Sequence, residues 1–272
     1  PERLVASGPL ARDHGIVMAG TPNSVITPGM YGKNEITESA AGYIHAIIHG
    51  EEADILLVPF PSEKRLNEVY LDETEEETKK AASYSEKMSS LFGSLATHFH
   101  EDSIHLIASH LFVMNSVEDG SERSIQLGGS YMVGGEIFPE NADYIALGHI
   151  HLPAELAKDR MYYAGSLEPT DKNDTGKHGY IKGEIKNGRT RTEFIPFASR
   201  EYVHMEVEAG SEMTGREMKE KISLAIRERG IQNIYKIILR GFRDPDMIYD
   251  TDRMDSYGNI VEILDETKPA YD

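Results

Sequence analysis

Residues 144–155 read YIALGHIHLPAE, an apolar run that leads into two histidines. The run from Tyr144 to Leu147 predicts a buried strand, and Gly148 ends it. In an extended chain, residues two apart point to the same face, so we expect His149 and His151 to project together from the strand end. Neutral imidazole is the commonest side-chain metal ligand, and this pair therefore indicates a metal site. Two exposed loop histidines are the alternative interpretation.

The chain has 272 residues, of which 39% are hydrophobic and 27% charged, an ordinary globular composition. This length permits one large domain or a domain with an appendage. The absence of cysteine excludes disulfides and thiolate metal sites, and it is compatible with a reducing, cytoplasmic location. The longest apolar run, ADILLVPF, is far shorter than a membrane span of roughly 20 residues. We therefore expect no membrane association, and the first residues show no secretion-signal pattern.

The formal net charge of −18 opposes non-specific binding of nucleic acid through bulk electrostatics. It does not exclude chemistry on nucleic acids. A group of carboxylates repels phosphate only until divalent cations fill it, so an acidic nuclease can supply positive charge as bound metal.

The first two thirds of the chain alternate strand and helix patterns. Residues 15–20 predict a short strand, and residues 42–61 predict a hairpin around a polar turn. A strong helix follows, with a capping box at Thr74 and Glu77 and apolar residues at helical spacing. Residues 103–114 predict a buried strand that runs out at His110, and residues 120–143 form a long polar loop.

The other histidines carry weaker signals. His45 and His49 fall on one face of the predicted hairpin, and without a third ligand type nearby we interpret them as structural or solvated. His98 and His100 lie at a helix end, where residues two apart point in different directions, so we expect no site there. His178 in its polar loop is expected to be solvated.

Composition changes near residue 198, and a compact β-α-β-β pattern follows. Residues 201–209 alternate as a strand should, and residues 214–230 predict a capped amphipathic helix. Two further strands are expected within residues 233–242 and 258–264. We therefore expect two domains, at residues 1–197 and 198–272.

Two separate buried strands thus end in histidine, one at His110 and the other at His149 and His151. With this pattern, the chain resembles the SbcD-type nucleases of the calcineurin-like metallophosphoesterase family. Eight segments carry the resemblance in the right order: the opening PERL text, LLVPFPSE, SHLFV, SERSIQLGGS, YIALGHIHLP, YYAGSLEP, YKIILRGFRDPD and GNIVEILDET.

The resemblance implies an α/β fold, a four-layer α-β-β-α sandwich followed by a small α+β capping domain that discriminates among DNA ends. It implies two divalent metals, typically manganese, that clamp the scissile phosphate and activate water. His110 and His149 would bind one metal and His151 the other. DNA would be the substrate, and an SbcC-like ATPase would be the partner. A phosphoesterase for small phosphodiesters or phosphoproteins is the alternative within this fold, and a non-catalytic scaffold is the alternative from another class.

The chain also departs from the family. The pattern requires an Asp-x-His, a Gly-Asp with the bridging aspartate, and an Asn-His with the catalytic histidine, and none of these motifs occurs here. The sequence therefore predicts a chain that begins downstream of the catalytic half, with the catalytic histidine absent. Three imidazoles without an anionic ligand should hold no metal or one weakly bound metal, so we expect the chain alone to be inactive. Exposed sheet edges would favour a homodimer.

Overall fold

The computed structural model describes residues 5–62, 77–113 and 131–271, and these residues divide between two compact units. The first unit runs to Gly165 and also includes Tyr180–Ile195. The second comprises Ser166–Gly179 and the chain from Pro196 onward. None of the described helices combines the length and apolar character that crossing a membrane requires.

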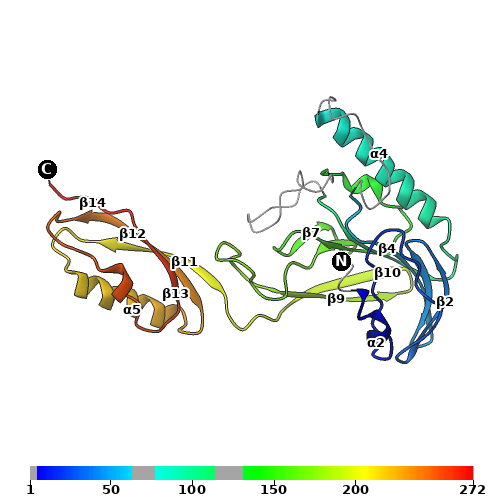
Figure 1. Cartoon of the computed structure of the whole chain (residues 1–272), viewed down its shortest axis with the longest axis horizontal. Coiled ribbons are helices and arrows are strands. Elements are labelled where there is room, and N and C mark those ends of the chain that lie inside the picture. Colours follow the sequence, from blue (N-terminus) through cyan, green and yellow to red (C-terminus); the bar gives the residue numbers. More distant parts are fainter. Residues whose placement is uncertain (1–4, 63–76, 114–130, 272) are drawn as a thin grey trace. The chain divides into compact units, whose positions relative to one another are not determined.

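Eight strands of the first unit form one mixed sheet in the order β1-β2-β3-β4-β5-β6-β8-β7 (Figure 1). Their bounds are β1 Gly29–Tyr31, β2 Asn34–Ala40, β3 Tyr43–Ile48, β4 Glu51–Val58, β5 Ile104–His110, β6 Tyr144–Gly148, β7 Ala154–Ala157 and β8 Met161–Tyr163. β4, β5, β6 and β8 are mutually parallel, whereas β1 to β4 form an antiparallel meander and β7 runs antiparallel to β8. The hairpin predicted within residues 42–61 is confirmed as β3 and β4.

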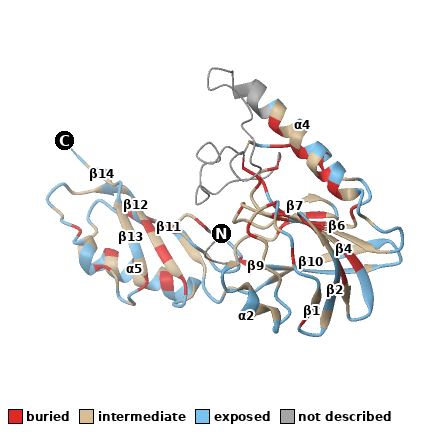
Figure 2. Ribbon diagram, turned by 45° about the vertical axis from the view of Figure 1, so that its right-hand side comes forward, coloured by how far each residue is buried: buried red, intermediate tan, exposed pale blue. Residues whose placement is uncertain are grey.

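The helix α4 (Glu77–Ala96) covers one face of this sheet with an apolar stripe at helical spacing. Tyr84, Met88 and Phe92 are buried on it, and they pack with Leu56 and Ile107 of the sheet. Figure 2 shows this buried stripe along one side of α4. The predicted helix is confirmed, but Thr74 of the expected capping box lies outside the described residues. So does the first part of the predicted loop 120–143, up to residue 130, and its described part includes a 3-10 turn, η2 (Gly135–Ile137).

The opposite face of the sheet carries a smaller apolar cluster, formed by Ile26, Tyr31, Ile36, Ile44 and Ala46. The strand expected at residues 15–20 is wrong, since this segment is irregular and follows a short helix, α2 (Gly8–Arg12). A separate hairpin joins β9 (Gly179–Lys186) to β10 (Arg189–Pro196). The mixed α/β class is confirmed. The four-layer sandwich stays a prediction.

The second unit is built around a parallel β-α-β crossover. β11 (Tyr202–Ala209) precedes the helix α5 (Gly215–Arg229) in sequence, and β12 (Ile234–Arg243) follows it. The two strands pair in parallel. β13 (Ile260–Asp265) continues the sheet in parallel, and β14 (Lys268–Pro269) pairs with the end of β12. A 3-10 turn, η3 (Thr251–Arg253), precedes β13.

The predicted boundaries of α5 are confirmed by its caps. Thr214 accepts a hydrogen bond from the backbone of Glu217, whose side chain accepts one in return, and Gly230 ends the helix at φ 113°. One face of α5 packs against the sheet of the second unit through the buried side chains of Met218, Ile222 and Ile226. The prediction for His178 is wrong, because this residue is buried and lies 3.1 Å from the carboxylate of Asp174. A loop that folds onto itself hides such a side chain, which composition alone does not reveal.

Candidate functional site

β5 and β6 end side by side at one edge of the sheet in the first unit. His110, the last residue of β5, is in register with Gly148, the last residue of β6. The carboxyl ends of parallel strands meet at one edge, so His149 follows directly beside His110. The two imidazole centroids are 5.3 Å apart and the ring planes meet at 77°. The structure thus brings together two of the three predicted ligands from segments distant in sequence.

Close backbone packing positions the His110 ring against β6. A Cβ atom at Gly148 would lie 2.9 Å from Nδ1 of His110, so glycine is required for this approach. The buried hydroxyl of Tyr163 fixes the chain that follows. It donates to the carbonyl of Leu111 at 2.6 Å and accepts from the N–H of Val113 at 2.9 Å.

Two aromatic rings flank the imidazoles. The Phe60 ring lies 5.6 Å from that of His110, and the Phe112 ring lies 5.9 Å from that of His149, measured between centroids. His110 is exposed, whereas His149 and His151 are half-buried. Exposed imidazole beside apolar walls leaves the edge accessible to a ligand from solvent.

The strand geometry expected for His149 and His151 is wrong. β6 ends at Gly148, and His149 has a φ of 114°, a region that L-residues rarely adopt. The extended conformation that would align the two imidazoles therefore ends before His149. A Cβ at Gly165 would lie 2.5 Å from the carbonyl oxygen of His151, so the loop after β8 packs on this turn. The ligand roles of His110, His149 and His151 stay predictions.

The donors at this edge are imidazoles. Neutral imidazole suits a transition-metal ion such as zinc or iron. Among the residues that the structure describes, no Asp or Glu joins the strand-end histidines in a metal-binding group of three or more side chains. Two cations about 3.5–4 Å apart need anionic ligands to offset their repulsion. This donor set therefore fits one metal and does not fit a two-metal centre.

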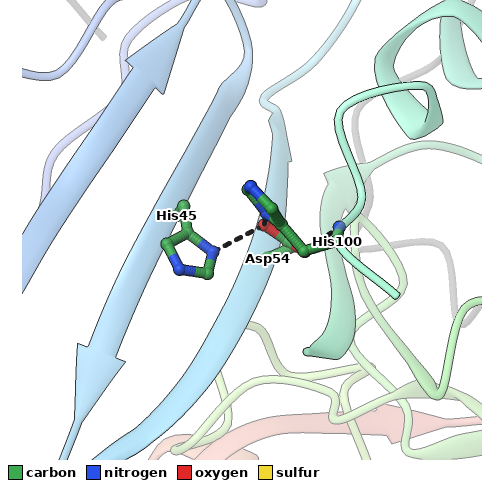
Figure 3. A group of neighbouring side chains, drawn as sticks. All are labelled: His45, Asp54 and His100. Carbon is green, nitrogen blue, oxygen red and sulfur yellow. Dashed lines mark hydrogen bonds and ion pairs between the residues drawn. The ribbon is translucent and has the colours of Figure 1, made fainter. Parts of the chain in front are cut away.

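A second group of ionisable side chains crosses the same sheet near its other end. Glu38, His45, Asp54 and His105 occupy successive paired positions on β2, β3, β4 and β5. The chain that follows α4 places His100 against Asp54 (Figure 3). His105 and His110 are five residues apart on β5, which separates the two groups by about 17 Å along the strand.

Asp54 is the centre of this second group and is fully buried. Its Oδ1 accepts from the Tyr43 hydroxyl at 2.7 Å and lies 2.8 Å from Nδ1 of His45 and 3.1 Å from Nδ1 of His100. Its Oδ2 accepts from the backbone N–H of His100 at 2.7 Å. Within the described part of the chain, His45, Asp54 and His100 are the group of three whose donor atoms lie close enough, within 4.8 Å of one another, to hold a metal.

Comparison with known proteins gives an informative match. No protein-family model matches the chain. The chain is 34% identical over 168 residues to the SbcD component of the nuclease SbcCD of Bacillus subtilis (strain 168), covering 61% of this chain and 39% of that protein. Over the matched residues, the chain is similar to this SbcD protein. The similarity thus spans less than half the length of the relative, whose name describes one component of a nuclease.

Hydrogen bonds set the charge states in the second group of this SbcD-like chain. Burial works to raise the pKa of Asp54, but the bonds from Tyr43, His100 and His45 outweigh it and lower that pKa to about 2. The bond to Asp54 raises the pKa of His100. Burial, together with the same carboxylate, raises the pKa of the Tyr43 hydroxyl well above its usual range, which keeps it a donor.

The second group corrects the interpretation of the weaker histidines in the SbcD-like chain. His45 is buried against Asp54, a third ligand type, and His100 joins them although His98 points elsewhere and stacks on Tyr43. The cross-strand register, which sequence does not specify, creates this proximity. One signal was available: an aspartate within the apolar run ADILLVPF must find partners when the strand is buried.

Proposed function

We propose that this SbcD-like chain supplies part of a metal-dependent nuclease that hydrolyses phosphodiester bonds in DNA repair and recombination. The convergence of His110 and His149 at the strand ends carries the proposal, in a chain whose relative is a component of a nuclease. Open α/β sheets bind ligands outside the carboxyl ends of their strands, where these imidazoles lie. The four-layer sandwich and the capping role of residues 198–272 belong to the same proposal.

The proposed metal ligands are His110, His149 and His151. Bound divalent metal would supply Lewis-acid chemistry at the phosphate, and manganese is the ion that the resemblance to SbcD-type nucleases implies. Their neutral nitrogens offer lone pairs but no charge, and the described neighbours add no carboxylate to the set. The chain alone should therefore hold one weakly bound metal or none, and we expect it to be inactive without further anionic ligands.

A local excess of positive charge supports contact with a phosphate backbone. The acidic chain, with a net charge of −18, carries exposed Lys186, Arg189 and Arg191 around the tip of the β9–β10 hairpin. These side chains line a shallow depression together with Glu184 and Asn187. Cationic side chains that neutralise phosphates provide affinity without sequence preference, as a nuclease of broad specificity requires.

The proposed partners are DNA and an SbcC-like ATPase, because the relative's name makes it one component of a complex. A homodimer is the further expectation. The side chain of Arg12 already donates to the Met30 carbonyl of the edge strand β1, so the opposite edge strand, β7, is the proposed place for such pairing.

The test is Mn²⁺-dependent hydrolysis of linear duplex DNA by the natural gene product that contains this chain. His149→Ala should reduce the rate by at least about 100-fold, on the order expected when a group that stabilises the transition state is lost. His49→Asn is the matched control, since His49 is exposed and asparagine tolerates its φ of 54°.

Three results would contradict the proposal. The first is full activity of the His149→Ala variant. The second is hydrolysis of a small chromogenic phosphodiester with no action on DNA, which would favour the small-substrate phosphoesterase. The third is the absence of any metal-dependent hydrolysis by the gene product, which would favour a scaffold.

A further inference from the structure

We propose that His45, Asp54 and His100 form a metal site for a divalent cation of the zinc class, separate from the proposed nuclease centre. The site joins β3, β4 and the segment that follows α4, as Figure 3 shows. It lies about 17 Å along β5 from the strand-end histidines. Its occupation is therefore independent of the proposed nuclease activity.

The geometry of the donors already approaches coordination. Both imidazoles turn Nδ1 toward the same carboxylate oxygen, at 2.8 Å for His45 and 3.1 Å for His100. Zinc bonds of about 2.0–2.2 Å at tetrahedral angles place ligand atoms roughly 3.3 Å apart. Both nitrogen–oxygen distances are within about 0.5 Å of that spacing, and all three donor atoms lie within 4.8 Å of one another, so a modest shift of the imidazoles would let one cation replace the protons between them.

The charge of the surroundings favours a cation. Asp54 places a carboxylate in a fully buried position, and two further carboxylates face the outer nitrogens. Glu52 Oε2 lies 3.9 Å from Nε2 of His45, and Glu38 Oε1 lies 3.9 Å from Nε2 of His100. A divalent ion would offset this negative charge more fully than two hydrogen-bonded imidazoles do.

The donor types select the metal. Two imidazoles and a carboxylate suit zinc, cobalt or nickel, whereas calcium and magnesium prefer oxygen ligands alone. The site also has an entry path. The His100 side chain is 44% exposed, whereas that of His45 is 9% exposed and that of Asp54 is fully buried. A metal can thus enter from the His100 side and be held against the sheet.

Bound metal would have a structural effect. His45 and Asp54 lie on the rigid β3–β4 hairpin, whereas His100 lies in the irregular segment between α4 and β5. A shared ion would tie the carboxyl end of α4 to the sheet. A metal bound to the folded chain in this way would add its binding free energy to the stability of the fold.

The experiment measures Zn²⁺ affinity of the full chain by competition with a chromophoric chelator. A His110→Ala/His149→Ala background removes two of the proposed nuclease ligands. In that background we expect one Zn²⁺ per chain, and Co²⁺ substitution should give the visible absorption of a four-coordinate ion. Introducing His100→Gln should weaken Zn²⁺ binding at least about tenfold.

His98→Gln is the matched control, because His98 is exposed in the same segment and stacks on Tyr43 instead of contacting Asp54. It should leave the affinity unchanged. His45→Gln provides a second, independent ligand removal, and circular dichroism establishes that each variant folds. Equal affinity in the His100→Gln and His98→Gln variants, or loss of all Zn²⁺ in the background variant itself, would overturn the proposal. Nuclease assays of His100→Gln and His98→Gln in the gene product that keeps His110 and His149 separate this result from the proposed function.

Discussion

The backbone N–H of His100 donates a 2.7 Å hydrogen bond to Oδ2 of Asp54, which lies 46 residues earlier in the chain. This bond holds the segment after α4 against a buried carboxylate. A buried charge is tolerated only when it is well paired, so Asp54 organises the side chains around it.

Replacing Asp54 by asparagine should destabilise the protein by about 3 kcal/mol, because the buried donors from Tyr43 and His45 lose a charged acceptor. Urea unfolding followed by circular dichroism measures the change. Asp102→Asn, an exposed substitution between α4 and β5, is the control and should change stability by less than about 0.5 kcal/mol. Equal effects of the two substitutions would contradict this role of Asp54.

Phe92 anchors α4 to the sheet, with its ring 4.8 Å from that of Phe138 and no exposed surface. Phe92→Ala should cost about 3–5 kcal/mol, through lost burial and the cavity that remains. Ser94→Ala, exposed on the same helix, should be nearly neutral. A loss below about 1 kcal/mol in the urea unfolding of Phe92→Ala would show that α4 does not depend on this contact.

Gly148 allows His110 to lie against β6, so Gly148→Ala should displace that exposed imidazole, with a loss of stability below about 1 kcal/mol. The His110–His149 contact should weaken as a consequence, which imidazole NMR shifts would detect. Gly183→Ala is the comparison, because its added Cβ would meet the nearest atom, the carbonyl oxygen of Arg191, at an ordinary 3.6 Å. Unchanged His110 resonances in a folded Gly148→Ala protein would refute the steric requirement.

The acid stability of the second unit should depend on Asp255. Burial works to raise its pKa, but hydrogen bonds from the backbone N–H groups of Ile260, Tyr257 and Gly258 lower the pKa below its usual range. A lowered folded-state pKa gives stability that is present above the unfolded-state pKa of about 3.9 and is lost as pH falls through the folded value.

Asp255→Asn should therefore unfold more easily than the parent chain at about pH 6 and lose this difference as the pH approaches about 3. Thermal melts across that range measure it. Asp252→Asn, exposed in the same segment, should follow the parent chain at every pH. A constant gap between Asp255→Asn and the parent would show that the carboxylate charge plays no part.

The β9–β10 hairpin should contribute to DNA affinity through charge alone. Arg189→Gln and Arg191→Gln should each reduce the slope of log affinity against log salt by about 0.9 if each side chain neutralises one phosphate. Fluorescence anisotropy with labelled duplex at several salt concentrations measures the slope. Lys33→Gln removes the same charge from the exposed β1–β2 turn and should leave the slope unchanged. If all three variants have the same slope of log affinity against log salt as the parent chain, the hairpin is not a contact surface for DNA.

Local signals in the sequence were sufficient to predict several helices and strands. The apolar spacing of Tyr84, Met88 and Phe92 specifies a helix with one buried face, and the Thr214–Glu217 box specifies where α5 begins. The apolar runs in the sequence also predict where two strands end, β5 at His110 and β6 at Gly148. Their parallel pairing places two imidazoles at one edge, as predicted for His110 and His149.

Contacts between side chains that are distant in sequence depend on the folded arrangement of the chain. Strand register joins His45 to Asp54, and the return of the chain after α4 joins His100 to both, although no local pattern links these three positions. The turn at His149 likewise depends on packing around Gly148 and Gly165 and breaks the alternation that an extended chain would have. Local propensity acts over a few residues, whereas a buried charge takes its partners from whatever segments the fold brings within hydrogen-bonding distance.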